Sequence, residues 1–187
     1  MGSHVIGSSL SGSSAGNPYT IEYTPAASAT IAVLSLIWNG TTARAGGGPT
    51  YAGSSMSQAG ASQAATEASV EMWYKFNPPV AACTVSIPNT GGLTLRAVLR
   101  DAAASPSGGS TLFDVATNAS GTGACPSDSV TTSSPGSFVI DRLGHGSNSV
   151  AGSGNQITFD RQDHGTFSSY AQYGLPSASG AITMKWD

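Results

Sequence analysis

Two histidine–aspartate pairs are the first groups in this chain whose residue types could do chemistry. His145 follows Asp141 by four residues in "DRLGHGS", and His164 follows Asp160 by four residues in "FDRQDHG". Four residues along a β-strand place two side chains on the same face but about 13 Å apart. Asp141 could therefore orient His145 as a catalytic base only if the strand bent at Gly144.

The acidic residues beside His164 supply oxygen atoms of the kind that bind calcium. The spacing of Asp160 and Asp163, however, does not follow an EF-hand pattern. The sequence also lacks a pair of carboxylates in the aromatic setting that glycosidases require. We therefore predict a protein that is not an enzyme, with no catalytic residues, no metal site and no cofactor.

The two cysteines, Cys83 and Cys125, each stand just before an expected strand. A disulfide between them needs Cα atoms about 5.5 Å apart, which a sequence cannot establish. A bridge and a pair of semi-buried free thiols are therefore both open. Neither cysteine has a neighbouring histidine to complete a zinc site.

Aromatic rings offer another way in which this chain could bind a ligand, because sugars stack on exposed rings. Tyr170 and Tyr173 lie in the loop-like "SSYAQYGLP" and are expected to be partly exposed. Trp73 lies in the alternating run "VEMWYKFNPP", on the same face as Glu71 and Lys75, and is either on a sheet surface or under a loop. The opposite face of that run is expected to be core: Val70, Met72, Tyr74 and Phe76.

Composition narrows the class of protein and its partners. Gly, Ser, Thr and Ala make up more than half of the 187 residues, and charged residues are 9% against a usual value of about 25%. The net charge of −3, with few and scattered basic residues, argues against nucleic-acid binding. The most apolar run, Ile31 to Trp38, is far shorter than the roughly 20 residues that span a bilayer. The composition fits a folded all-β domain with long Ser-, Gly- and Ala-rich loops.

Short apolar runs between turn signals predict one domain over residues 1–187, built from about ten strands. An antiparallel two-sheet sandwich would bury their apolar faces, with Ile31 to Trp38 as a central strand covered on both sides. The Ala and Gln content of Ser57 to Thr66 allows a helical turn there, which Gly60 weakens. In residues 93–100 the set Leu93, Leu95, Ala97 and Leu99 should face inward, and Thr94, Arg96 and Arg100 outward. The strands are expected at 5–10, 19–23, 31–38, 50–51, 68–77, 84–87, 93–100, 129–132, 137–143, 157–160 and 182–186.

The order of five motifs resembles a jelly-roll β-sandwich family found in phage structural proteins and bacterial surface proteins. These motifs are "ATIAVLSLIW", "GGGPTYAGSSMSQAG", "VEMWYKFNPPVAACTVSIPN", "SFVIDRLGHGS" and "GAITMKWD". The resemblance implies a jelly roll in which "EMWY" followed by "NPP" is a central strand with a tight exit. Members usually continue into one more apolar strand after the last motif, whereas this sequence ends at Asp187. That strand is absent, is supplied by a neighbouring subunit, or is replaced by the N-terminal strand.

The resemblance and the composition together lead to an expected function. We expect a structural protein of an extracellular assembly, most simply a phage virion component such as a capsid decoration or tail-associated protein. Its partners would be further copies of itself and other virion or surface proteins, in a virion or extracellular location. The alternatives are a carbohydrate-binding or adhesion module on a cell surface and a filament subunit joined by strand donation. Residues 1–4, "MGSH", are either a vector remnant or an N-terminal arm, and no signal peptide is recognisable.

Overall fold

The structure, a computed structural model, describes residues 5–64, 68–103, 127–132, 139–145, 157–163, 168–174 and 180–185. These residues form β-strands, turns and loops, with no helix among them, and all of their strand pairs are antiparallel. The described part therefore holds no helix of the length and apolarity needed to cross a bilayer. The predicted all-β class is confirmed, and the arrangement is consistent with a β-sandwich.

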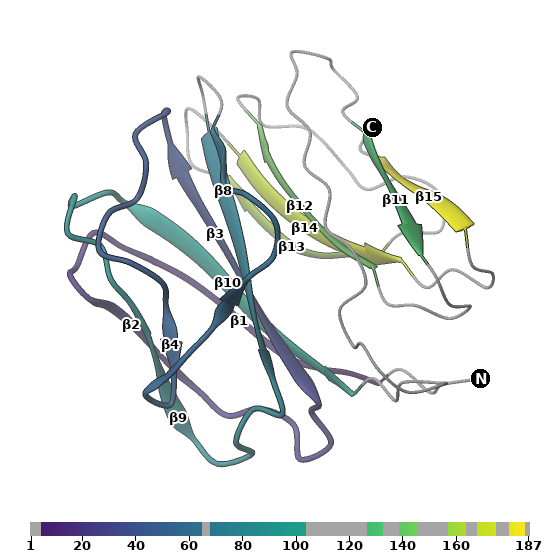
Figure 1. Ribbon diagram of the computed structural model, residues 1–187, viewed down its shortest axis with the longest axis horizontal. Helices are drawn as coiled ribbons and strands as arrows, with labels where there is room; N and C mark the ends of the chain where they lie inside the picture. The colour runs from purple at the N-terminus through teal and green to yellow at the C-terminus, as the bar shows by residue number, and fades with distance from the viewer. Residues whose placement is uncertain are drawn as a thin grey trace.

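A six-stranded sheet, the central sheet, forms the middle of the described structure (Figure 1). Its main path runs through β1 (Val5–Ser14), β10 (Leu95–Ala103), β3 (Ile31–Asn39), β8 (Ala68–Phe76) and β6 (Ser57–Gln58), and β7 (Gln63–Ala64) also pairs with β8. The run "IAVLSLIW" of β3 is buried at every position because other strands cover both of its faces. The prediction of a central strand at Ile31 to Trp38 is confirmed.

A four-stranded sheet, the outer sheet, packs on one face of the central sheet. Its order is β2 (Tyr19–Tyr23), β9 (Cys83–Ile87), β4 (Thr50–Tyr51) and β5 (Ser54–Ser55). Burial alternates along "YTIEY" of β2, so its three apolar residues face inward. They meet the face of the central sheet that carries Leu34, Leu36, Trp38, Leu95 and Leu99, and together these residues form the main core.

A three-stranded sheet lies against the second face of the central sheet (Figure 1). Its order is β12 (Val139–His145), β14 (Ser168–Gly174) and β13 (Ile157–Asp163). Ile140 of β12 packs there against Ile31, Val33 and Ala102. A separate two-stranded sheet pairs β11 (Ser127–Thr132) with β15 (Gly180–Lys185). The central sheet is therefore packed on both sides.

The strand count and the layering differ from the prediction. The described residues form 15 strands in four sheets, where about ten strands in two sheets were expected. The segment from Ser57 to Ala64 forms β6 and β7 along the edge of β8, so the helical turn that the composition allowed does not form in these residues. Backbone pairing with β8 outweighs the helix preference of the Ala and Gln residues, and Gly60 breaks the segment with φ +70°.

The predicted alternation of β10 is right for one face and incomplete for the other. Leu95, Ala97 and Leu99 are fully buried in the main core, as expected. Val98, on the other face, is buried as well, and Arg96 and Arg100 are only partly exposed. The two arginines were expected to face outward, and they lie on the face opposite the main core, where each keeps only part of its surface exposed.

Candidate functional site

Trp73 lies on the main-core side of β8, directly opposite Leu34 of β3. Residues 40–49, here called the glycine-rich loop, cover its ring. A Cβ atom placed on Gly48 would come within 3.0 Å of the ring, and the guanidinium of Arg44 lies 5.7 Å from the ring centroid. Of the two placements that the sequence left open, the structure shows the second: Trp73 lies under a loop.

Tyr170 and Tyr173 are not in a loop, so their expected setting is wrong. Both belong to β14, the middle strand of the three-stranded sheet, where Tyr170 pairs with Leu143 and Tyr173 with Ile140 of β12. Strand β13 pairs with the other edge of β14. Small residues interrupt the apolar pattern of this segment, and its strand state rests on pairing with β12 and β13. The role of the two tyrosines as ligand contacts stays a prediction.

The structure leaves the remaining candidate residues apart. Cys83 is partly buried at the start of β9, and Cys125 lies outside the described residues, so their pairing stays a prediction. Strand β12 keeps one register with β14 through Gly144, which gives no bend that would bring Asp141 and His145 together. His164 also lies outside the described residues. Where the chain is described, no three His, Cys, Asp or Glu residues gather closely enough to hold a metal ion.

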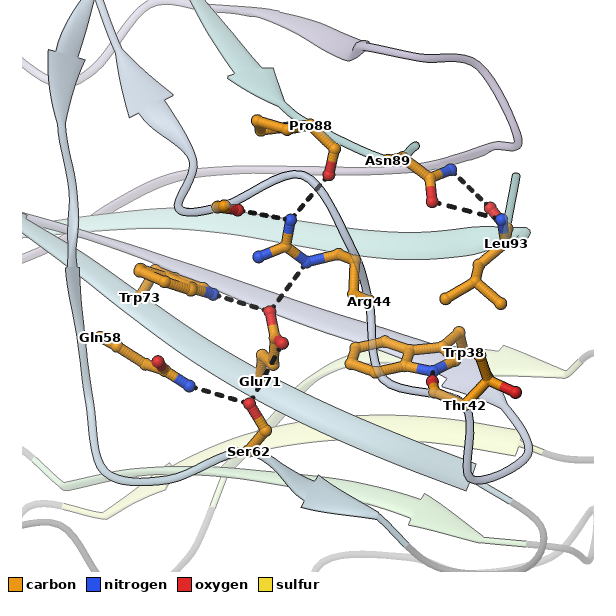
Figure 2. A network of polar contacts seen from close by, with 11 residues as sticks. Trp38, Thr42, Arg44, Gln58, Ser62, Glu71, Trp73, Pro88, Asn89 and Leu93 are labelled. Atoms are coloured by element: carbon orange, nitrogen blue, oxygen red, sulfur yellow. Dashed lines mark hydrogen bonds and ion pairs between the residues drawn. The ribbon is translucent and has the colours of Figure 1, made fainter. Parts of the chain in front are cut away.

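The most elaborate polar arrangement in the described residues joins the glycine-rich loop to β8 (Figure 2). The Nε atom of Arg44 donates to Glu71 Oε2 at 2.9 Å, and the side chains are 2% and 7% exposed. The indole Nε1 of Trp73 donates to the same carboxylate oxygen at 3.0 Å. Ser62 donates its hydroxyl to the other oxygen, Oε1, at 3.1 Å, and in turn accepts from Gln58 at 2.9 Å. Both oxygens of the buried carboxylate are therefore hydrogen-bonded.

Arg44 also holds two backbone segments through its Nη1 atom. This atom donates to the carbonyl oxygen of Gly47 at 2.8 Å and to that of Pro88 at 2.7 Å. The first bond closes the glycine-rich loop on itself, and the second ties it to the chain that leaves β9. The loop is also fixed at its start, because Trp38 Nε1 donates to the carbonyl oxygen of Thr42 at 2.7 Å.

Sequence reasoning missed this network. Arg44 was not singled out, and Glu71 was expected to be on the face opposite the core. The available signal was that Arg44 is the only charged residue between Glu22 and Glu67, and it stands inside the small-residue run "ARAGGGP". A single charge in a long uncharged stretch indicates a specific partner, although the sequence does not say which one.

A second buried joint is centred on Asn89, which has no exposed surface. Its Nδ2 atom donates to the carbonyl oxygens of Leu93 at 2.7 Å and Gly16 at 3.3 Å, while Oδ1 accepts from Leu93 N at 3.2 Å. Its backbone N–H donates to Asn17 Oδ1 at 3.1 Å. Asn89 thus ties the turn that follows β9 to the segment between β1 and β2.

A cluster of buried tyrosines and one carboxylate lies at the opposite end of the main core. Asp101, 1% exposed, accepts a hydrogen bond from the backbone N–H of Ala26 at 2.6 Å and one from the Tyr23 side chain. Burial, followed by the nearby Asp101 carboxylate, raises the pKa of Tyr23 well above its usual value. Burial, followed by the neighbouring Cys83 thiol, raises the pKa of Tyr51 in the same way. These buried phenols stay neutral.

One short motif resembles a hydrolase nucleophile turn but lacks its setting. Residues Gly12 to Gly16, "GSSAG", match the spacing Gly-x-Ser-x-Gly. Ser14 is the last residue of β1, its hydroxyl accepts from the backbone N–H of Gly16 at 2.9 Å, and the chain continues through a turn into β2. A nucleophile elbow requires a helix at that point, so Ser14 acts here as a turn residue.

The polar groups of the described residues thus lock loops onto a β framework. Arg44 and Asn89 each join segments that are distant in sequence, and their hydrogen-bonding atoms are directed at other parts of the same chain. Comparison with known protein families, with characterised proteins and with solved structures finds no match to this chain.

Proposed function

We propose that this chain is a non-enzymatic structural protein that associates with copies of itself in an extracellular assembly. Within that class, a phage virion component such as a capsid decoration or tail-associated protein agrees with the sequence resemblance described above. The jelly-roll topology that the resemblance implies belongs to the same proposal. The assembly would place the protein on the outside of a particle, in contact with its own copies and with other virion proteins.

The observation that carries the proposal is the closed polar network around Glu71. A ligand site keeps polar atoms directed at an open space, whereas both Glu71 oxygens here accept bonds from other side chains of the protein. The guanidinium of Arg44 likewise donates its hydrogen bonds within the protein, to Glu71 and to two backbone carbonyl oxygens. Such an arrangement stiffens a scaffold, and a rigid scaffold with locked loops suits a building block of a particle.

The surface chemistry supports the same function. The chain contains two lysines, Lys75 and Lys185, and its loops are rich in Ser, Thr and Gly. Small hydroxyl side chains lose little conformational entropy when a neighbouring subunit packs on them, while lysine loses much more. A surface of this kind can be buried repeatedly between subunits at low entropic cost.

The assembly state of the purified protein tests the proposal. We expect multi-angle light scattering during size-exclusion chromatography to show a mass above 18.6 kDa that rises with concentration. Negative-stain microscopy of the same samples would separate closed oligomers from filaments. A constant monomer mass over a wide concentration range, with no particles on the grids, would overturn self-assembly as the function.

A further inference from the structure

Strand β1 forms one edge of the central sheet. It pairs with β10 on one side, and no other strand in the described part of the chain pairs with its outer side. Its ten residues, "VIGSSLSGSS", include no charged residue and no proline. Edge strands of natural proteins usually carry charges, prolines or coverings that prevent pairing with another chain. β1 has none of these protections within its own sequence.

The longer of the other sheet edges differ from β1 in this respect. Strand β2 carries the exposed Glu22, and the edge strand β12 carries Asp141 and Arg142. The opposite edge of the central sheet is covered, because β6 and β7 both pair with β8 there. β1 is therefore the long edge at which another strand could be added without placing a charge in the interface.

The side chains of β1 add a second observation. Leu10 is 39% exposed, and it is one of two large hydrophobic residues that are exposed among the described residues. It lies opposite Leu99, and Gly12, two residues further along on the same face, lies opposite Ala97. Gly12 has no side chain to fill the edge, and a Cβ there would come within 2.6 Å of the Tyr19 hydroxyl. An exposed apolar side chain thus lies beside a residue that has no side chain and is covered by the Tyr19 hydroxyl.

We propose that β1 pairs in an antiparallel manner with β1 of a second copy, around a two-fold axis that lies perpendicular to the sheet and passes midway between the two Ser11 residues. The two-fold places Leu10 of each copy opposite Gly12 of the other, so that each exposed leucine meets a residue without a side chain. The proposed strand pair involves the segment Ser9–Ser14, whose register with β10 is regular. It does not include the irregularity between Ile6 and Ser9.

Electrostatics are compatible with a second copy as the partner. Two-fold pairing brings two identical strands together, so any charge on β1 would be repeated on its partner and weaken the pair. β1 has no charge, and it is compatible with itself for this reason. The inference rests on the proposed function, since it names the contact through which the assembly forms.

Leu10→Lys tests this contact, with Val80→Lys as the matched control. Both residues are exposed and apolar, at 39% and 53%, but Val80 lies in the turn between β8 and β9, away from the β1 edge. We expect Leu10→Lys to raise the dissociation constant of the dimer at least tenfold in sedimentation velocity, because a charge on an edge strand opposes pairing. Val80→Lys should leave that constant unchanged.

The outcomes separate the two proposals. If the wild-type protein stays monomeric at every concentration, the proposed function and this interface both fail. If it self-associates and Leu10→Lys behaves like Val80→Lys, the interface is overturned while the proposed function stands. Circular dichroism of both variants shows that a loss of association does not come from unfolding.

A disulfide at the two-fold tests the register. Antiparallel neighbours have Cα atoms about 4.5 to 5.5 Å apart, within the range that a disulfide spans. In oxidising buffer, Ser11→Cys should therefore give a covalent dimer whose digest contains two copies of the β1 peptide joined through the introduced thiols. Thr20→Cys, exposed on β2, is the control and should give no such dimer. Cross-linking of Ser11→Cys at no more than the control level would overturn the register.

Discussion

Arg44 and Glu71 form an ion pair, with 2.9 Å between Nε and Oε2, at the junction of the glycine-rich loop and β8. They are 27 residues apart in sequence, and both are shielded from solvent. A buried pair of this kind contributes little net energy by itself, but its loss is costly because the remaining charge has no partner. This pair also fixes the position of Trp73 and of two backbone carbonyls, so its effects should extend beyond two side chains.

Arg44→Ala is expected to destabilise the protein by about 3 kcal/mol or more, because Glu71 would keep a buried charge without its cation. Arg44→Lys should be intermediate, since one ammonium group cannot reach the carboxylate and both carbonyls with the geometry of a guanidinium. Urea unfolding followed by tryptophan fluorescence measures both values. A loss below about 1 kcal/mol for Arg44→Ala would show that the pair is not buried as described.

Asn89→Asp is expected to destabilise the protein at neutral pH by about 2 to 4 kcal/mol, because a carboxylate would replace a donor that serves two carbonyl oxygens. That setting would raise the pKa of the new carboxyl in the folded state. An acid with a raised folded pKa favours the native state when protonated, so the stability of Asn89→Asp should recover as pH falls from that folded pKa toward about 4, the unfolded value.

The exposed Asn77 supplies the control for that measurement. Asn77→Asp should change stability by less than about 0.5 kcal/mol and should show no recovery in acid. Equal losses for the two variants would contradict the role of Asn89 as a buried joint.

Ala52→Asn is expected to stabilise the protein by about 0.5 to 1 kcal/mol. Ala52 and Gly53 form the two-residue turn between β4 and β5, with φ of +49° and +75°, and alanine is strained there whereas asparagine tolerates the left-handed region. Asn77 has a similar φ of +46°, so Asn77→Ala should lower stability by a comparable amount. Thermal unfolding of both variants should show opposite shifts in Tm.

The fold followed from the sequence where apolar residues repeat with a strand period. Ile31 to Trp38 and Tyr19 to Tyr23 have such patterns, and both lie where they were expected. β14 did not show such a pattern, because small and polar residues surround Tyr170 and Tyr173, and its strand state comes from pairing with β12 and β13. Periodicity reports which face is buried, but it does not report a pairing that forms between segments tens of residues apart.

The polar network could not be derived from the sequence for a similar reason. Alternation correctly placed Glu71 and Trp73 on one face of β8, but the pattern suggested that this face was the less buried one. The glycine-rich loop covers it, and the conformation of that loop depends on left-handed φ values at Gly46 and Gly47 and on Arg44. Glycine runs allow many backbone conformations, so only the folded partners select one of them.

Because of the buried tyrosines, the free energy of unfolding should depend on pH in the alkaline range. The pKa values of Tyr19, Tyr23 and Tyr51 are raised by burial, and a phenol with a raised folded pKa favours the native state while it is neutral. Their contribution is complete below about pH 10, the unfolded value, and is lost as pH rises above it. We expect the free energy of unfolding to be flat from about pH 8 to 9.5 and to fall steeply above about pH 10.

Absorbance at 295 nm measures phenol ionisation directly during the same titration. The three buried tyrosines should ionise together with unfolding, as circular dichroism follows it, at a pH above the usual tyrosine pKa. Tyr51→Phe should make the free energy of unfolding fall less steeply with pH above about pH 10. The variant has one phenol fewer whose pKa differs between the folded and unfolded states. If all six tyrosines ionised near pH 10 while the circular dichroism stayed native, the burial of this cluster would be contradicted.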